Sequence, residues 1–361
     1  MTILITGGAG FIGTSVVKHL LATSDLELLV VDNLHPQVHG ANPTPPAILA
    51  DQRVTFIRGD VTDASTWDRV LSGIAIDAVL HLAAETGTGQ SLLEASRHAN
   101  VNVNGTAALL DGLSRNRVVP GRVVLTSSRA VYGEGRWRDP LDGSFFYPGP
   151  RGAAQLARHE WDPRAPSGKS GVFTQHRARD VEPRPTNVYA ATKLAQEHLL
   201  TVWASSFDVQ LGILRLQNVY GAGQAVGNPY TGVLTFFANQ LLAGNTVPVY
   251  EGGGITRDFV HVNDVVGAIT TALVKQPEPA GQYVVDIGSG HPSTLLENAE
   301  LLAEASGGRT PVVTTDFRLG DVRAAYADIG DAQALLGYEP KVPFSDGALD
   351  LLDWVRTQRN L

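Results

Sequence analysis

The first 32 residues contain two short apolar runs separated by a helical pattern. The first run spans residues 2–6, a glycine-rich turn occupies residues 7–13, and the second run ends at Asp32. Short apolar runs of this kind predict buried strands, and the amphipathic stretch between them predicts a helix. The beginning of the chain therefore predicts a βαβ unit.

Four further apolar runs follow among helical patterns, at residues 54–60, 78–84, 122–128 and 210–216. Strands that alternate with helices typically form a parallel sheet covered on both faces. We predict an α/β fold with a doubly wound parallel Rossmann sheet. Ligands bind beyond the carboxyl ends of such strands. The functional candidates are the residues at those ends: Asp32, Asp60, Ala83, Ala84, Ser128, Gln217 and Asn218.

The glycine turn has the spacing that a dinucleotide requires. Without side chains, Gly8 and Gly10 let the backbone turn tightly and approach a pyrophosphate, and Gly13 lets the helix lie close to the sheet. Asp32 follows about 20 residues later, where an acidic side chain accepts both ribose hydroxyls of NAD. Because its charge would repel the additional phosphate of NADP, the sequence predicts NAD as the cofactor.

Two stretches lack a clear period. Residues 35–50 are rich in proline and predict a loop beside the adenosine of the cofactor. Residues 134–185 combine proline, glycine, arginine and aromatic residues. An irregular segment of this length is more often a functional lid or a contact arm than a random coil, so we expect it at the active site or at an interface.

Composition excludes several classes of protein. The 36 acidic and 28 basic residues give a net charge of -8 without a long block of one sign, which disfavours a nucleic-acid surface. The absence of cysteine removes disulfides, thiolate metal ligands and thiol nucleophiles, and nothing in the pattern indicates a metal site. Met1 leads directly into a core strand, and no apolar run is long enough to span a bilayer, so we expect a cytoplasmic enzyme without a membrane partner.

Catalytic chemistry is indicated by Ser128, Tyr189 and Lys193. Lys193 lies four residues after Tyr189, on the same face of a predicted helix, so its ammonium is expected close to the phenol. A free tyrosine has a pKa near 10, whereas a neighbouring lysine and a positively charged nicotinamide both favour the phenolate. Ser128 is placed to align the same substrate hydroxyl.

An ordered series of motifs extends over nearly the whole chain. It comprises Gly59-Asp60-Val61, His81 to Ala84, Asn102 to Thr106, Val131-Tyr132-Gly133, Tyr189 to Lys193, Asn218 to Gly221 and Arg257 to Val262. With the glycine turn, this series resembles the extended short-chain dehydrogenase/reductases that act on nucleotide sugars. Residues 81–90 and the long insertion are most similar to the dTDP-L-rhamnose 4-epimerase branch, and UDP-glucose 4-epimerases are similar as well.

The resemblance implies two sets of contacts. Those to NAD involve Gly7, Gly10, Phe11, Ile12, Gly13, Asp32, Asn33, Asp60, Val61, Leu82, Ala83, Ala84, Asn102, Tyr189 and Lys193. Those to the substrate, a nucleoside diphosphate sugar, involve Thr86, Ser128, Asn218, Arg257 and Arg318. Arginine suits the diphosphate because its planar fork can bind phosphate oxygens with two hydrogen bonds.

The resemblance also narrows the reaction. Sugar 4,6-dehydratases carry Asp-Glu where this chain has Arg129 and Ala130, and the decarboxylases carry Glu at the second position. The family's 3,5-epimerases use a cysteine. We therefore expect an NAD-dependent C4 epimerase of a dTDP- or UDP-linked hexose or 6-deoxyhexose, acting through a transient 4-keto intermediate. An NAD(P)H-dependent 4-ketoreductase and a non-catalytic dinucleotide-binding regulator are the alternatives.

The resemblance implies a two-domain subunit. An NAD-binding domain is expected over residues 1–220, including the insertion, and it also receives about 256–290. Residues 221–255 and 291–361 are expected to form a smaller α/β domain that binds the nucleotide sugar. The helical segments 92–113 and 189–205 carry enough apolar surface to pair with a second copy, and the resemblance implies a homodimer.

Overall fold

A seven-stranded sheet forms the centre of the computed structural model, which describes residues 1–228, 232–275 and 281–359. The strand order is β13-β9-β5-β4-β1-β2-β3, and every neighbouring pair is parallel. The strands are β1 (Thr2–Thr6), β2 (Glu27–Asp32), β3 (Val54–Arg58), β4 (Ala78–His81), β5 (Arg122–Ser128), β9 (Gln210–Leu216) and β13 (Gln282–Ile287). The predicted doubly wound Rossmann sheet is confirmed.

Two predicted strands are longer than the observed ones. β3 ends at Arg58 and β4 at His81, so Gly59-Asp60 and Leu82 to Ala84 belong to the loops that follow. β13, which pairs with β9 at the sheet edge, is a strand that the apolar runs did not single out.

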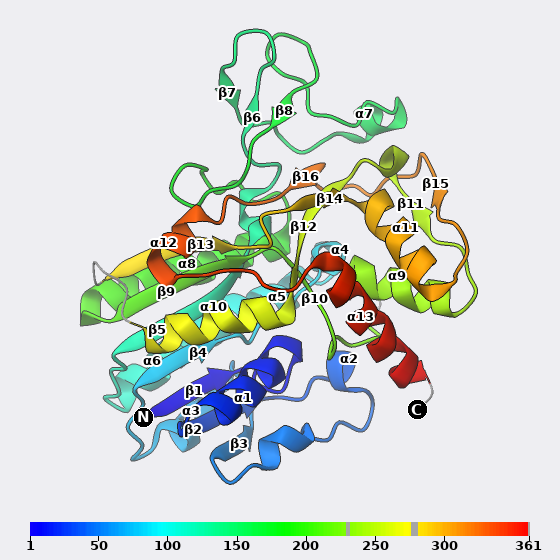
Figure 1. Cartoon of the computed structure of the whole chain (residues 1–361). Helices are drawn as coiled ribbons and strands as arrows, with labels where there is room; N and C mark the ends of the chain where they lie inside the picture. The colour runs from blue at the N-terminus through cyan, green and yellow to red at the C-terminus, as the bar shows by residue number, and fades with distance from the viewer. Residues whose placement is uncertain (229–231, 276–280, 360–361) are drawn as a thin grey trace.

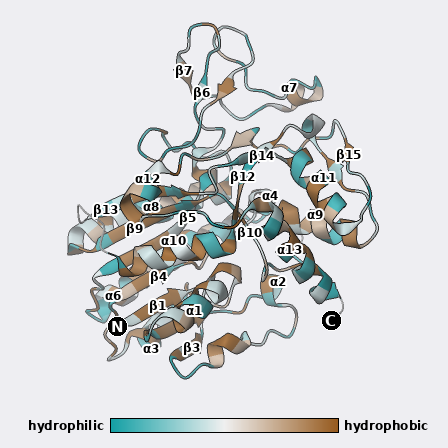
Figure 2. Cartoon of the chain, viewed as in Figure 1, coloured by the Kyte–Doolittle hydropathy of each residue, from teal (hydrophilic) through white to brown (hydrophobic). Residues whose placement is uncertain are grey.

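Helices cover both faces of this sheet (Figure 1). One face packs against α1 (Phe11–Thr23), α10 (Val262–Val274) and α12 (Gly330–Leu336). The other face packs against α3 (Ala64–Leu71), α6 (Gly105–Arg115) and α8 (Val188–Phe207). Hydrophobic residues follow the strands and the helices that cover them (Figure 2). Burial of both faces explains why the strands read as nearly continuous apolar runs.

The C-terminal part builds a second hydrophobic core. It includes β10 (Asn218–Tyr220), β12 (Thr256–His261), β14 (Pro292–Thr294) and β16 (Ala324–Ala325), with β12 paired to the other three. The helices α9 (Val233–Leu242), α11 (Leu295–Ser306) and α13 (Phe344–Arg359) pack together beside this sheet. β11 (Pro248–Val249) and β15 (Val312–Val313) form a separate parallel pair. The predicted domain division stays a prediction, and residues 229–231, 276–280 and 360–361 within its segments lie outside the described residues.

The insertion forms a small lobe of its own, at the top of Figure 1. Its three short strands, β6 (Trp137–Arg138), β7 (Phe145–Phe146) and β8 (Val172–Phe173), pair antiparallel in the order β7-β6-β8. A short helix, α7 (Ala153–Ala157), lies between β7 and β8. The two-residue strands explain why the sequence shows no period here.

Short helices occupy the loops around the carboxyl edge of the sheet. α2 (Pro36–His39) lies in the predicted loop 35–50, and α4 (Thr88–Leu93) and α5 (Ala95–His98) follow β4. Within the described ranges, no helix is both long and apolar enough to cross a membrane.

Candidate active site

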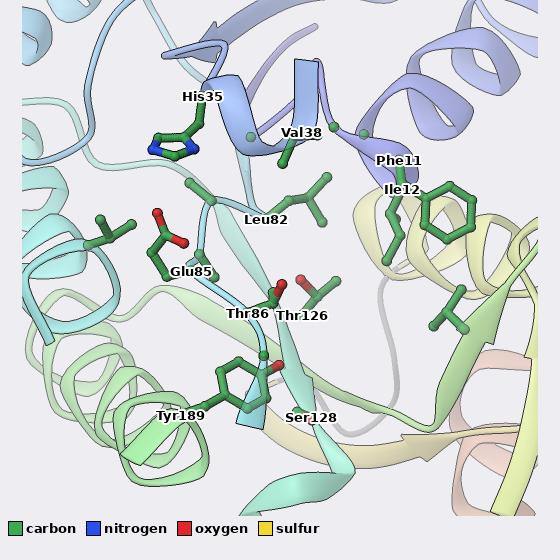
Figure 3. Close-up of a pocket in the computed structure, with 18 of the residues that line it drawn as sticks. Phe11, Ile12, His35, Val38, Leu82, Glu85, Thr86, Thr126, Ser128 and Tyr189 are labelled. Carbon is green, nitrogen blue, oxygen red and sulfur yellow. The ribbon is translucent and has the colours of Figure 1, made fainter. Parts of the chain in front are cut away.

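A cavity of about 500 Å³ lies at the carboxyl ends of β1, β2, β4, β5 and β9. Its lining includes most of the predicted cofactor residues: Gly7, Gly10, Phe11, Ile12, Gly13, Asp32, Asn33, Val61, Leu82, Ala83, Ala84, Tyr189 and Lys193. Three of the predicted substrate residues, Thr86, Ser128 and Asn218, line it as well. Figure 3 shows Phe11 and Ile12 toward one end of this cavity and Tyr189 and Ser128 toward the other.

The glycine turn lies in a space that a side chain would fill. Gly7 has a φ of +68°, and a Cβ added to it would lie 2.7 Å from the backbone nitrogen of Ala83. A Cβ on Gly13 would lie 2.5 Å from the carbonyl oxygen of Gly7. α1 begins after Gly10 without a side-chain cap, so its first amides are available to an anion. This cradle fits the pyrophosphate of a dinucleotide.

Asp32 is fixed by backbone amides at the end of β2. Its two carboxylate oxygens accept hydrogen bonds from Ala9 N (3.0 Å) and Leu34 N (2.8 Å). Each oxygen keeps a free lone pair, so the carboxylate can still accept ribose hydroxyls. The geometry fits the NAD preference that the sequence predicts.

Asp60 and Asn102 are not among the residues that line the cavity. Burial acts to raise the pKa of Asp60, but hydrogen bonds from Thr62 and Asn33 outweigh it and lower the pKa. The Asn102 amide accepts a hydrogen bond from Glu85 N (2.7 Å) and donates to Thr192 (2.9 Å). It thereby ties the loop after β4 to α8.

Tyr189 and Ser128 approach one another from different elements. Ser128 is the last residue of β5, and Tyr189 is in the first turn of α8, whose N-cap Asn187 accepts a hydrogen bond from Ala190 N (2.9 Å). The phenol and the Ser128 hydroxyl lie within hydrogen-bonding reach (Figure 3). Burial raises the pKa of Tyr189, while Ser128 and the positive charge of Arg129 act to lower it.

Lys193 points to a different partner from the one its spacing suggested. Its buried ammonium donates a 2.5 Å hydrogen bond to the Gln196 amide oxygen, and Gln196 in turn donates to Thr106 (2.8 Å). Burial lowers the pKa of Lys193 to about 7, although Glu197 acts to raise it.

The two arginines predicted to bind the diphosphate lie outside the lining of the cavity, unlike Asn218. Arg257 is buried and donates to the carbonyl oxygens of Val322 (2.8 Å) and Thr256 (2.8 Å). Burial, with the nearby charge of Arg129, lowers the pKa of Arg257 to about 9. Arg318 is exposed and lies over the Tyr250 ring, 5.3 Å from its centroid.

Sequence reasoning missed other polar residues of the cavity. Glu85 lines it and pairs with Arg97, whose Nη2 lies 2.8 Å from the Glu85 carboxylate. His35, Gln37 and His39 line it from the loop that was predicted beside the adenosine. The insertion 134–185 contributes no lining residue within the described parts of the chain. The sequence signal that could have pointed to these side chains is their closeness in the chain to Ala84 and Asp32, which were predicted site residues.

Comparison with known proteins places the chain among enzymes with this architecture. A family model described as "NAD dependent epimerase/dehydratase family" matches residues 3–151 and 166–288. The chain is 45% identical to a dTDP-L-rhamnose 4-epimerase of Burkholderia thailandensis, over 98% of this chain and 94% of that protein. It is 31% identical to a dTDP-glucose 4,6-dehydratase of Streptomyces niveus, over 99% and 94%.

A solved structure shares the fold along its whole length. The UDP-glucose 4-epimerase of Thermus thermophilus, in complex with NAD, aligns with a TM-score of 0.75 and 29% identity. The alignment covers 99% of both chains.

Proposed function

Since the chain belongs to the NAD dependent epimerase/dehydratase family, we propose that it inverts C4 of a nucleoside diphosphate sugar with NAD as its cofactor. The observation that carries the proposal is the meeting of Ser128 and Tyr189 in the cavity that also contains the glycine cradle and Asp32. The substrate we propose is a dTDP-linked 6-deoxyhexose of the rhamnose type, because the relative with 45% identity is named for that sugar.

The cofactor fits the residues that are present. The space beside Gly7 and Gly13, the uncapped start of α1 and the carboxylate of Asp32 suit the pyrophosphate and the ribose of NAD. When bound, NAD supplies reversible hydride transfer, because it can take a hydride from C4 of the sugar and return it to the opposite face. Since no net oxidation occurs, the same NAD can serve successive turnovers.

The protein's own part is proton transfer. Tyr189 as phenolate removes the proton of the 4-hydroxyl, and the C4–O bond becomes a carbonyl as the hydride leaves C4. Ser128 donates a hydrogen bond to the same oxygen and holds it in place. The keto sugar then rotates in the pocket. The Tyr189 hydroxyl returns its proton to the 4-oxygen while the hydride is returned to the opposite face of C4.

The positions after Ser128 separate epimerisation from dehydration. Loss of water across C5 and C6 needs an acid for the departing hydroxyl and a base for the C5 proton. The two residues after Ser128 are Arg129 and Ala130, and neither has a carboxyl group. Epimerisation needs no further acid or base, so it agrees with the side chains that are present.

We further propose that the enzyme is a homodimer. The candidate face contains exposed apolar side chains on α4 and α8, with Leu93 86% exposed and Val202 68% exposed. Burial of such side chains against a second copy would stabilise a dimer. The cytoplasmic location remains a prediction from the sequence.

The proposal is tested by analysing the products that the protein forms from a panel of nucleotide-linked sugars. The purified protein is incubated with dTDP-, UDP- and GDP-linked hexoses and 6-deoxyhexoses and trace NAD, and proton NMR follows C4 while absorbance follows the reduced cofactor. Inversion at C4 without net NADH is the expected result. Net consumption of NADH or NADPH with a 4-keto sugar, and no inversion of any sugar, would establish the ketoreductase instead.

A further inference from the structure

A set of side-chain hydrogen bonds joins α2 to α4 and α5 at the cavity. The Gln37 side-chain nitrogen donates to the Gln90 amide oxygen (2.9 Å), and the Gln90 nitrogen donates to the Gln37 oxygen (3.1 Å). The same Gln37 oxygen accepts a bond from Arg97 Nη2 (3.0 Å), and the Gln37 nitrogen also donates to Asn228 (3.3 Å). We call Gln37, Gln90 and Arg97 the polar bridge. The proton transfer proposed for Tyr189 and Ser128 does not use it.

The polar bridge lies beside the glycine cradle. In the sheet, β1 is placed between β4 and β2. α2 follows β2, whereas α4 and α5 follow β4, so a link between them passes beyond the end of β1, from which the cradle extends. Gln37 and Arg97 line the same cavity as the cradle glycines. Figure 3 shows His35, next to α2, and Glu85, in the loop after β4, at this cavity. The bridge therefore borders the space that fits the dinucleotide.

Gln90 and Arg97 are held in place by charged neighbours. Gln90 is 2% exposed and also donates to the Glu94 carboxylate (3.1 Å). Arg97 binds Glu94 through Nη1 (2.7 Å) and Glu85 through Nη2 (2.8 Å). The backbone nitrogen of Glu85 donates in turn to Asn102 (2.7 Å). This side of the bridge is therefore fixed to the body of the protein, and two carboxylates balance its guanidinium.

α2, on the other side, has little apolar packing to hold it. All 4 of its residues are half-buried or exposed, and Val38 is 44% exposed. Its turn is stabilised locally by a bond from Gln37 N to His35 Nδ1 (3.2 Å). His39 lies 3.9 Å from Asp32, which is longer than a hydrogen bond. The side-chain amide of Gln37 is therefore the main connection of α2 across the cavity.

Such a connection governs how readily a bound cofactor leaves. A cofactor beside a surface segment dissociates when that segment moves away, and this movement requires the bonds from Gln37 to Gln90 and Arg97 to break. The net loss of one or two hydrogen bonds changes a rate about 10-fold. Because an epimerase returns the hydride to the sugar from the same NAD, retention of NAD between turnovers suits its reaction.

We propose that Gln37 is a positioning residue for the cofactor: by fastening α2 to Gln90 and Arg97, it retains NAD in the cavity between turnovers. The proposal rests on the NAD-dependent epimerisation of the proposed function. It adds Gln37 to the NAD contacts that the resemblance implied, which did not include this residue.

The experiment measures how fast NAD leaves the protein in the absence of sugar. Protein loaded with radiolabelled NAD is mixed with an excess of unlabelled NAD, and rapid gel filtration follows the label that remains bound. The variants are Gln37→Met, which keeps the length of the side chain without its amide, Gln90→Ala, and the two combined. Gln282→Ala is the matched control. Gln282 also donates two side-chain bonds, to Thr201 O (3.1 Å) and Ser205 Oγ (2.8 Å), but lies at the amino end of β13, away from the cavity.

The dissociation rate of NAD is expected to rise about 10-fold in Gln37→Met and in Gln90→Ala. The double variant is expected to release NAD about as fast as either single variant, because each change breaks the same amide pair. Gln282→Ala is expected to release NAD at the native rate. The melting temperature of NAD-free Gln37→Met is expected to stay native, which separates retention of the cofactor from a general loss of stability.

A native dissociation rate in Gln37→Met would overturn the proposal, and this variant decides the question even where Gln90→Ala fails to fold. Effects that multiply in the double variant would also overturn it, because the two amides would then act separately. The measurement needs neither sugar nor turnover. A protein that retains NAD through Gln37 but inverts no sugar would contradict the proposed function and leave the role of Gln37 in place.

Discussion

Tyr189 and Lys193 lie four residues apart on α8, yet their polar ends face different partners. The phenol lies within hydrogen-bonding reach of Ser128, and the ammonium donates to Gln196. Helical spacing places two Cβ atoms on one face, but long side chains then follow the nearest buried partner. Ser128 could be predicted from the sequence because it ends a strand, whereas the orientation of Lys193 could not.

At the residue scale, removal of one hydroxyl tests the proposed base. Tyr189→Phe is expected to lower kcat by about 10²-fold or more, because positioned proton transfer contributes that much. The Tyr147→Phe variant removes a hydroxyl that, in the described part of the chain, accepts a bond from Glu182 N alone, and it is expected to keep native activity. Initial rates by NMR and a thermal melt of each variant make the measurement. Residual activity above a tenth of native would contradict the role.

At the scale of elements, the turn between β1 and α1 could be predicted almost completely from the sequence. Its glycines, the following helix and Asp32 are close in sequence, so local pattern specifies how they lie. The ends of β3 and β4 were predicted too far along the chain, because their last residues turn away from the sheet into the loops around the cavity. The pattern of apolar residues indicates which positions are buried, not which are in a strand. These loop residues are partly buried, so the pattern extended the predicted strands over them.

Replacing a glycine by alanine in this turn and in an open helix position shows whether close packing or helix propensity determines the effect on stability. In Gly13→Ala the new Cβ would meet backbone atoms of Gly7 and Gly8 at about 2.5 Å, which should cost 1–3 kcal/mol or more and weaken NAD binding. Gly267→Ala, inside α10 with no atom within 4 Å of the new Cβ, is expected to stabilise by up to about 1 kcal/mol. Urea unfolding measures both. Equal effects would show that close packing is not what requires Gly13.

At the scale of the whole molecule, a buried ion-pair network joins the insertion to the C-terminal part. Arg151 binds Glu251 through Nη1 (2.6 Å) and Nη2 (3.0 Å), and Glu134 through Nε (3.0 Å), with about 1% of its side chain exposed. The sequence offered no signal for this contact, because Arg151 and Glu251 are 100 residues apart.

Arg151→Met removes the cation that binds both buried carboxylates and leaves Glu251 with a longer contact, 3.6 Å, to Arg323. We therefore expect a loss of about 3–5 kcal/mol of unfolding free energy. The exposed Arg158 lies in the same lobe and pairs with Glu160 at the surface. Arg158→Met is therefore expected to stay within about 0.5 kcal/mol of native. Denaturant unfolding compares the two, and similar stabilities would mean that the network does not hold the insertion in place.

A second link between the sheet and the insertion predicts a pH dependence. Burial raises the pKa of Asp286 on β13 to about 7, although hydrogen bonds from Tyr132 and from the Ala178 backbone and the charge of Arg215 act to lower it. The neutral Asp286 carboxyl makes its full contribution to the free energy of unfolding below about pH 4, the pKa of an aspartate in the unfolded chain. This contribution is lost as the pH rises to about 7.

Between pH 5 and pH 8, the unfolding free energy of the native chain should therefore fall by about 2–3 kcal/mol relative to Asp286→Asn. Paired denaturant titrations at each pH supply the measurement. Parallel curves for the two proteins would show that Asp286 is ionised throughout this range.

The sequence by itself determined six of the seven strands of the sheet, the glycine cradle, Asp32 and the pair Ser128 and Tyr189. Each depends on local spacing and on the common edge at which parallel strands end. Only the tertiary structure decided that Lys193 donates to Gln196, that Arg257 is bound to backbone carbonyls, and that Arg151 docks the insertion. These depend on which buried partner a long charged side chain meets. That partner comes from distant segments, and the cost of leaving a buried charge unpaired determines the choice.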